Sequence, residues 1–130
     1  MRIFMLLLSF LWVPGFVFAG DEEVAAPTIE YLEMKPKFTV NLAQPKQYLA
    51  VSVQLMVEGD EFIEKVKKNL PALRHELIML YSGRFAEDLQ TMEQREALRK
   101  ETKEAIMAVL EKFSNSDGFR DVFFTEFLIN

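Results

Sequence analysis

Residues 48–57 read YLAVSVQLMV, a stretch whose residues alternate in character. Successive side chains of a strand point to opposite faces of a sheet, so a period of two indicates a strand with one buried face. Branched apolar residues occupy one face, namely Val51, Val53, Leu55 and Val57. Smaller or more polar residues occupy the other, namely Ala50, Ser52, Gln54 and Met56. The pattern predicts a strand whose branched face belongs to a core.

The segment before this strand alternates less regularly. One face of residues 29–42 carries Phe38, Val40 and Leu42. Pro36 interrupts the segment, and because proline cannot donate to a strand ladder it predicts a break or an edge there. A short turn at residues 44–46, Gln-Pro-Lys, then separates the two strand-like runs. The arrangement predicts an antiparallel hairpin.

Three helices are expected after the strand. Gly59 ends the strand, and Asp60 is expected to cap the first helix. Pro71 is expected to open the second helix, because proline is tolerated in a first turn, and Gly83 to stop it. Residues 91–94, Thr-Met-Glu-Gln, match a capping box and open the third helix. One face of that helix carries Leu98, Thr102, Ala105, Ile106, Val109 and Phe113.

Residues 119–129 form a phenylalanine-rich strand at the end of the chain. Strict alternation puts Phe124 and Leu128 on one face and Phe123, Phe127 and Ile129 on the other. Apolar residues on both faces predict a central or well-covered strand. The order β-β-α-α-α-β favours the α+β class, with a small antiparallel or mixed sheet and the helices on one face.

The first 19 residues carry a separate signal. Arg2 precedes an apolar run, Pro14-Gly15 breaks that run, and a small residue ends it. This order is typical of a secretory signal peptide, while the alternative is an N-terminal membrane anchor, since a spanning helix needs at least ~17 residues. Residues 20–30 are acidic and are expected to be a linker. Residues 31–130 are then one folded domain, placed across the inner membrane in the periplasm by either alternative.

Composition argues against several classes of function. The chain has 20 acidic and 15 basic residues, a net charge of −5, so it lacks the basic surface that nucleic acids require. It has no polybasic run for anionic lipid. Without cysteine, a disulfide, a thiolate metal site and a cysteine nucleophile are impossible. His75 is the only histidine, so we expect a surface or interface role for it instead of a metal site.

Paired carboxylates are the remaining candidates for chemistry. Three pairs lie three residues apart on helical stretches: Glu61 with Glu64, Glu93 with Glu96, and Glu101 with Glu104. Such pairs can serve acid–base chemistry or bind a cation. Lysines lie within one turn of them, however, and this spacing favours solvated ion pairs, with Glu64 next to Lys67 and Lys68, Glu96 next to Lys100, and Glu104 after Lys100. The cluster Phe123, Phe124 and Phe127 favours core packing or a sheet interface over a ligand box. We therefore expect a non-enzymatic protein with no catalytic, cofactor-binding or metal-binding residues.

Several blocks of the sequence resemble one known family in order and spacing. They are Phe38 to Leu42, Tyr48 to Leu55, Leu70-Pro71 to Ile78, Asp88 to Thr91 with Leu98-Arg99, and the terminal Val122-Phe123-Phe124-Thr125-Glu126-Phe127-Leu128-Ile129-Asn130. From about Tyr31 to Asn130 the chain resembles the flagellar basal-body-associated FliL family.

This resemblance implies a fold of the stomatin/prohibitin type. It also implies homo-oligomers beside the flagellar stator and basal body, at the inner membrane, and a role in motility, chemotaxis or torque through protein–protein binding. The alternative is a general periplasmic adaptor or scaffold of the same fold with no part in motility.

Overall fold

The computed structural model of the chain describes residue 15 and residues 27–130. The predicted signal peptide or anchor at residues 1–19, apart from Gly15, and the linker up to residue 26 lie outside the described residues. The elements run in the order β1 (Ile29–Glu33), β2 (Phe38–Asn41), β3 (Tyr48–Glu58), α1 (Asp60–Lys68), α2 (Leu70–Tyr81), the 3-10 turn η1 (Ala86–Leu89), α3 (Met92–Phe113) and β4 (Phe119–Ile129). No helix in this described part of the chain is long and apolar enough to cross a membrane.

The described residues fold as an α+β domain with a fully antiparallel sheet centred on β3. β1 pairs with the second half of β3 and β2 with its first half, while β4 runs along the opposite edge of β3. The single irregular strand expected over residues 29–42 is therefore two strands. The chain breaks around Pro36, as its sequence predicts, but both pieces return to the same neighbour. Because β1 begins at Ile29, the last two residues of the expected linker already belong to the sheet.

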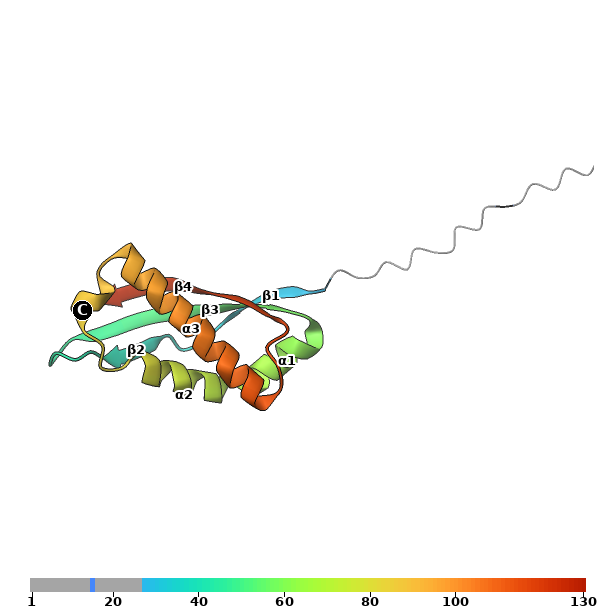
Figure 1. Cartoon of the computed structure of the whole chain (residues 1–130), viewed down its shortest axis with the longest axis horizontal. Coiled ribbons are helices and arrows are strands. Elements are labelled where there is room, and N and C mark those ends of the chain that lie inside the picture. Colours follow the sequence, from blue (N-terminus) through green and yellow to red (C-terminus); the bar gives the residue numbers. More distant parts are fainter. Residues whose placement is uncertain (1–14, 16–26) are drawn as a thin grey trace, which may run out of the picture.

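The helices lie on one face of the sheet, as predicted (Figure 1). The branched face of β3 points at them, and Leu49, Val51, Val53, Leu55 and Val57 are fully buried. Figure 1 shows α3 lying obliquely across β4 and β3, with α2 beside it and α1 near the end of β3. The C-terminus lies at the end of the sheet away from the start of β1.

Two of the features predicted for the helix ends are confirmed, and one is wrong. The Thr91 capping box is confirmed, since Thr91 Oγ1 accepts from Gln94 N at 3.1 Å and Gln94 Oε1 accepts from Thr91 N at 3.0 Å. Pro71 lies in the first turn of α2, as expected. The expected cap at Asp60 is wrong, because Gly59 is the N-cap and no side chain caps α1. Gly59 has a φ of 96°, which lets the chain turn sharply into the helix.

The expectation that β4 is a central or well-covered strand is wrong, because β4 is an edge strand in the described domain and most of its residues are half-buried or exposed. β3 already pairs with β1 and β2 along its other edge, so β4 forms the outer edge of the sheet. Several of its phenylalanines are therefore only half-buried. A β-bulge also changes which of its residues share a face: Ser52 pairs with Glu126 and Val53 with Phe124, leaving Thr125 as the extra residue. Phe124, Phe127 and Ile129 consequently lie on the helix side, opposite Phe123 and Leu128.

Candidate functional site

One member of each of the three carboxylate pairs is engaged by a basic side chain. Glu64 forms the predicted ion pair with Lys67 at 3.8 Å. Glu96 pairs with Arg99 at 2.6 Å, where the sequence suggested Lys100. Glu101 of α3 pairs with Arg84, in the loop after α2, at 2.6 Å. Within the described residues, no group of three potential metal ligands gathers.

His75 lies exposed on α2. It borders a shallow hollow shared with the end of α3, lined by Ala72, Glu76, Ala108, Val109, Lys112 and Phe113. Phe113 is exposed there, although the periodicity of α3 placed it on the same face as Leu98. The hollow is an exposed junction of two helix surfaces and holds no second imidazole.

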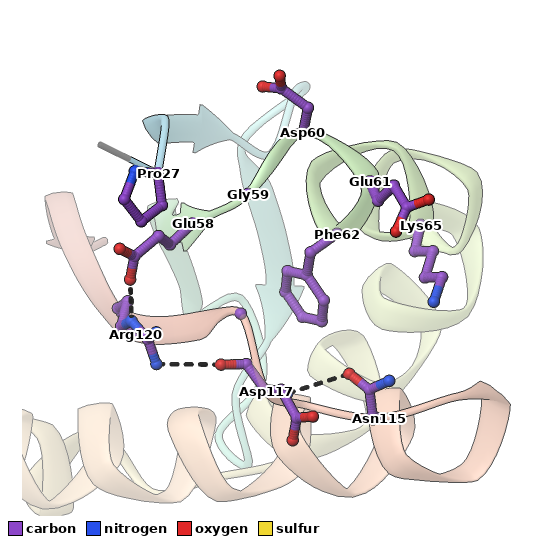
Figure 2. Close-up of a pocket in the computed structure, with 11 residues that line it drawn as sticks. Pro27, Glu58, Gly59, Asp60, Glu61, Phe62, Lys65, Asn115, Asp117 and Arg120 are labelled. Atoms are coloured by element: carbon purple, nitrogen blue, oxygen red, sulfur yellow. Dashed lines mark hydrogen bonds and ion pairs between the residues drawn. The ribbon is translucent and has the colours of Figure 1, made fainter. Parts of the chain in front are cut away.

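A second hollow lies where the chain enters the domain (Figure 2). Figure 2 shows Arg120 of β4 reaching Glu58 at the end of β3, with Arg120 also donating to the Asp117 carbonyl at 3.0 Å. The ring of Phe62 forms one wall, and Asp60 points away from the centre. The polar groups here connect the β3 end to the turn before β4, which is a structural role.

A third feature, which we call the β4 groove, follows the outer edge of β4 beside the first half of α3. Its cavity volume is about 500 Å³, and its lining consists of Met92, Arg95, Glu96, Arg99, Asp121, Phe123, Phe124 and Phe127. Met92, Arg95, Glu96 and Arg99 share one side of α3 because residues three and four apart lie on one helix face. Phe124 and Phe127 stack at 5.6 Å between ring centroids. The groove therefore combines aromatic walls with charged groups.

Arg99 and Asp121 close one end of the β4 groove. Arg99 Nη1 lies 2.6 Å from Asp121 Oδ1 and donates to the Val122 carbonyl at 3.1 Å. Asp121 Oδ1 accepts from the Val122 N–H at 2.8 Å. The N–H and C=O groups of Val122 point away from β3, and each is thus hydrogen-bonded to a side chain. This pair blocks the sheet edge locally, which is one way proteins protect an edge strand.

The electrostatics of this ion-pair cluster follow from its contacts. Burial raises the pKa of the Asp121 carboxyl, but the Val122 N–H bond and the charges of Arg99 and Lys103 outweigh it, so the pKa is lowered overall. The hydrogen bond from Arg99 lowers the pKa of the Glu96 carboxyl. The same hydrogen bond raises the pKa of Arg99. All three groups remain charged near neutral pH.

Arg95 has a different environment. Its guanidinium lies over the Phe127 ring, 4.6 Å from the centroid, and its Nε donates to the Leu89 carbonyl at 3.2 Å. It forms no ion pair with any described residue. The sequence patterns assigned no role to Arg95, and Arg99 entered only as part of the Leu98-Arg99 block of the family resemblance. The four-residue spacing of the two arginines at the start of α3 is the signal that could have drawn attention to them.

The sheet face away from the helices carries a smaller aromatic patch. Tyr31 of β1 and Phe123 of β4 lie 6.4 Å apart between ring centroids, across Met56 and Gln54 of β3. Tyr31 is exposed, and no described helix covers this face. The Phe cluster predicted from sequence is therefore divided between the two faces of the sheet. Phe124 and Phe127 lie on the helix side, while Phe123 lies on the open face, although all three border the β4 groove.

Comparison with known proteins identifies the family. The family model described as flagellar basal body-associated protein FliL matches residues 31–129, from β1 to the end of β4. The chain belongs to the FliL family. The match includes every described helix and three complete strands, and thus both walls of the β4 groove.

A curated FliL relative agrees with this assignment. The flagellar protein FliL of Aquifex aeolicus (strain VF5) is 33% identical over 110 residues, covering 82% of this chain and 66% of that protein. The chain therefore spans just under two thirds of the length of this relative.

Proposed function

We propose that this protein is a non-enzymatic accessory of the flagellar motor that acts by protein–protein binding. It associates with the basal body and the stator on the periplasmic side of the inner membrane, and supports motility or torque. The observation that carries the proposal is the FliL family match, which extends over the folded domain from residue 31 to residue 129.

The described surfaces support a binding role. The β4 groove offers aromatic rings and a guanidinium that has no carboxylate partner among the described residues, a combination that is enriched at protein interfaces. Glu64 and Glu101 are held in ion pairs on different helices and His75 borders a separate hollow, whereas acid–base catalysis requires a group held within hydrogen-bond reach of the proton that it transfers.

Self-association is part of the proposal. A sheet covered by helices on one face leaves Tyr31, Met56 and Phe123 on the other, where a neighbouring subunit can pack. The proposal includes the relation to stomatin/prohibitin-type domains that the family resemblance implies. Because the chain lacks cysteine, single cysteines introduced on this face give an unambiguous cross-linking test in cells. Disulfide-linked species from a contiguous patch support oligomers, and monomers at every position contradict them.

The N-terminal segment determines how the domain is held at the membrane. A signal peptide cleaved after Ala19 releases the domain, and an uncleaved anchor retains it. Intact-mass measurement of protein from a periplasmic fraction distinguishes the two, because a mass that still includes Met1 and Arg2 rejects cleavage.

Deletion of the gene tests the proposed function directly. We expect reduced swimming or swarming in soft agar, restored by the wild-type gene in trans. The alternative, a general periplasmic adaptor with no part in motility, predicts normal swimming in the deletion strain. Filament counts by electron microscopy then separate assembly from torque, since a torque defect leaves filaments present but turning weakly.

A further inference from the structure

The two edges of the sheet differ in how well they are protected. The β1–β2 edge consists of two short strands separated by Pro36, whose carbonyl accepts from Arg74 Nη1 at 2.7 Å. Short strands and proline discourage an added strand. β4 is 11 residues long and contains no proline, and among the described residues side chains block its outer edge only at Val122.

The unblocked part of the β4 edge can be located from its hydrogen bonding. Asn130 and Tyr48 exchange both backbone hydrogen bonds, at 3.1 and 3.0 Å. In an antiparallel pair such residues alternate with residues whose N–H and C=O point away from the partner strand. Ile129 and Phe127 therefore direct their N–H and C=O groups outward. On the other side of the bulge, Phe124 and Val122 also direct theirs outward. Described side chains form no hydrogen bonds to Phe124, Phe127 or Ile129.

The β4 groove lies beside this open stretch. Phe124 and Phe127 are half-buried there, so they offer apolar surface without being closed into the core. Glu96 and Asp121 are already held by Arg99, at 2.6 Å each. Arg95 is the lining guanidinium that lacks a carboxylate partner among the described residues. A carboxylate of a binding partner could therefore form an ion pair with Arg95.

We infer that the open edge of β4 between Phe124 and Ile129 accepts an extended segment of another protein by strand addition. That segment carries an acidic side chain, which pairs with Arg95, between apolar side chains that pack on Phe124 and Phe127. Main-chain hydrogen bonds supply affinity in this mode, and alternate side chains supply specificity. The inference rests on the proposed function only in treating this domain as a binding module.

A second copy of β4 is a poorer occupant. Its only acidic residue between Phe124 and Ile129 is Glu126, which pairs with Ser52, faces away from the helices, and contacts Lys37 at 3.4 Å. Pairing two β4 edges would therefore offer no carboxylate to Arg95. The occupant that matches the charge is a segment from a different chain.

The test uses the full-length protein and a short fluorescein-labelled peptide of alternating valine and threonine with one central glutamate. Two matched peptides serve as controls: one has glutamine in place of glutamate, and the other is N-methylated at the amides of alternate residues. We expect the glutamate peptide to bind, the glutamine peptide to bind about tenfold more weakly, and the N-methylated peptide to lose binding, as measured by fluorescence anisotropy. No binding of the first peptide, or equal binding of all three, overturns the inference.

Arg95→Gln should weaken the glutamate peptide about tenfold and leave the glutamine peptide unchanged. Arg120→Gln is the matched control, since Arg120 lies on β4 outside the groove and should leave both affinities unchanged. Circular dichroism verifies that each variant is folded. If Arg95→Gln does not fold, the peptide comparison on the wild-type protein still decides the question.

Photo-cross-linking in cells identifies the natural occupant. Benzoylphenylalanine replaces Met92, which lines the groove, or Met79 as an exposed control on α2, the two being 80% and 64% exposed. A cross-link from position 92 alone, to a segment with an acidic residue between apolar residues, supports the inference. Cross-links from position 92 only to a second copy of this chain overturn it.

The two proposals fail separately. If the peptide binds as expected but the deletion strain swims normally, the flagellar role is rejected and the strand-addition site stands. If the deletion strain does not swim but no peptide binds, the strand-addition site is rejected and the flagellar role stands.

Discussion

The Tyr81 hydroxyl and Thr102 Oγ1 lie 2.8 Å apart in the core between α2 and α3. Thr102 Oγ1 also donates to the Leu98 carbonyl at 2.8 Å. Because a threonine hydroxyl has one hydrogen, Tyr81 is the donor of the bond between the two side chains. The pair connects the helices at a position where both residues are fully buried.

Thr102→Val should destabilise the domain more than Tyr81→Phe. Valine leaves the buried Tyr81 hydroxyl without a partner, a cost of about 1–3 kcal/mol, whereas phenylalanine leaves Thr102 bonded to Leu98 and costs about 1 kcal/mol. Urea denaturation measures both free energies of unfolding. The double variant should lose less than the sum of the single variants, and strict additivity would contradict the proposed donor–acceptor chain.

Tyr81 should make the domain sensitive to alkali. Burial is the main cause that raises the pKa of the Tyr81 phenol above its ordinary value of 10.0. The unfolded chain then loses this proton at a lower pH than the folded chain does. The contribution of this phenol to stability is therefore constant below about pH 10 and falls above it, by at most ~1.4 kcal/mol per pH unit. Denaturation between neutral pH and high pH should show a shallower decline in Tyr81→Phe, and an equal decline would contradict the assignment to this phenol.

Asp121→Asn should remove an acid-sensitive contribution to stability. The folded pKa of Asp121 is depressed below its ordinary value of 3.8, so its contribution is present above that pH and is lost as the pH falls. At neutral pH the substitution should cost about 1–2 kcal/mol through weakened bonds to Arg99 and Val122. The difference from wild type should therefore become smaller as the pH falls below 3.8 and the Asp121 carboxylate of the folded protein takes up its proton. Glu126→Gln, on the same strand in an exposed pair with Lys37, is the control expected to change little.

Gly118→Ala should destabilise the junction before β4. An added Cβ would lie 2.4 Å from ring atoms of Phe62 and 2.5 Å from the Glu58 carbonyl oxygen. Overpacking against backbone costs about 1–3 kcal/mol. In a Phe62→Ala background the cost should decrease without vanishing, because the carbonyl remains. A stability loss below ~0.5 kcal/mol in the wild-type background would show that the junction adjusts freely.

The bulge at Thr125 predicts an order of costs for apolar truncations. Phe124 is half-buried on the helix side, so Phe124→Ala should cost about 1–3 kcal/mol, below the ~3–5 kcal/mol of a fully buried phenylalanine. Leu77→Ala, at a fully buried position, should cost about 2–5 kcal/mol. Leu128 is 51% exposed, so Leu128→Ala should cost less than ~0.5 kcal/mol. Equal losses in the free energy of unfolding for Phe124→Ala and Leu128→Ala would indicate strict alternation and contradict the bulge.

Features that depend on neighbouring residues could be predicted from the sequence. The strand at residues 48–57, the proline that opens α2 and the Thr91–Gln94 capping box are all present as expected. Alternation, φ restriction and capping act over a few residues, so their physical causes are contained in the local sequence. The assignment to the FliL family likewise depended on blocks that match in order, and the family model confirms it.

The sheet edge and the candidate groove depended on tertiary structure. The sequence pattern indicated the strand-like segment at residues 29–42 and the phenylalanine-rich strand β4. Apart from the hairpin, it did not indicate which strands these segments pair with. β1 and β2 share one edge of β3 because the break at Pro36 lets each half pair independently, which leaves β4 at the other edge. The bulge at Thr125 then shifts the residues on the helix side, and Arg99 meets Asp121 from 22 positions away in the chain. Strand partners, register and such distant ion pairs are set by the packing of the whole domain, so local periodicity alone does not specify them.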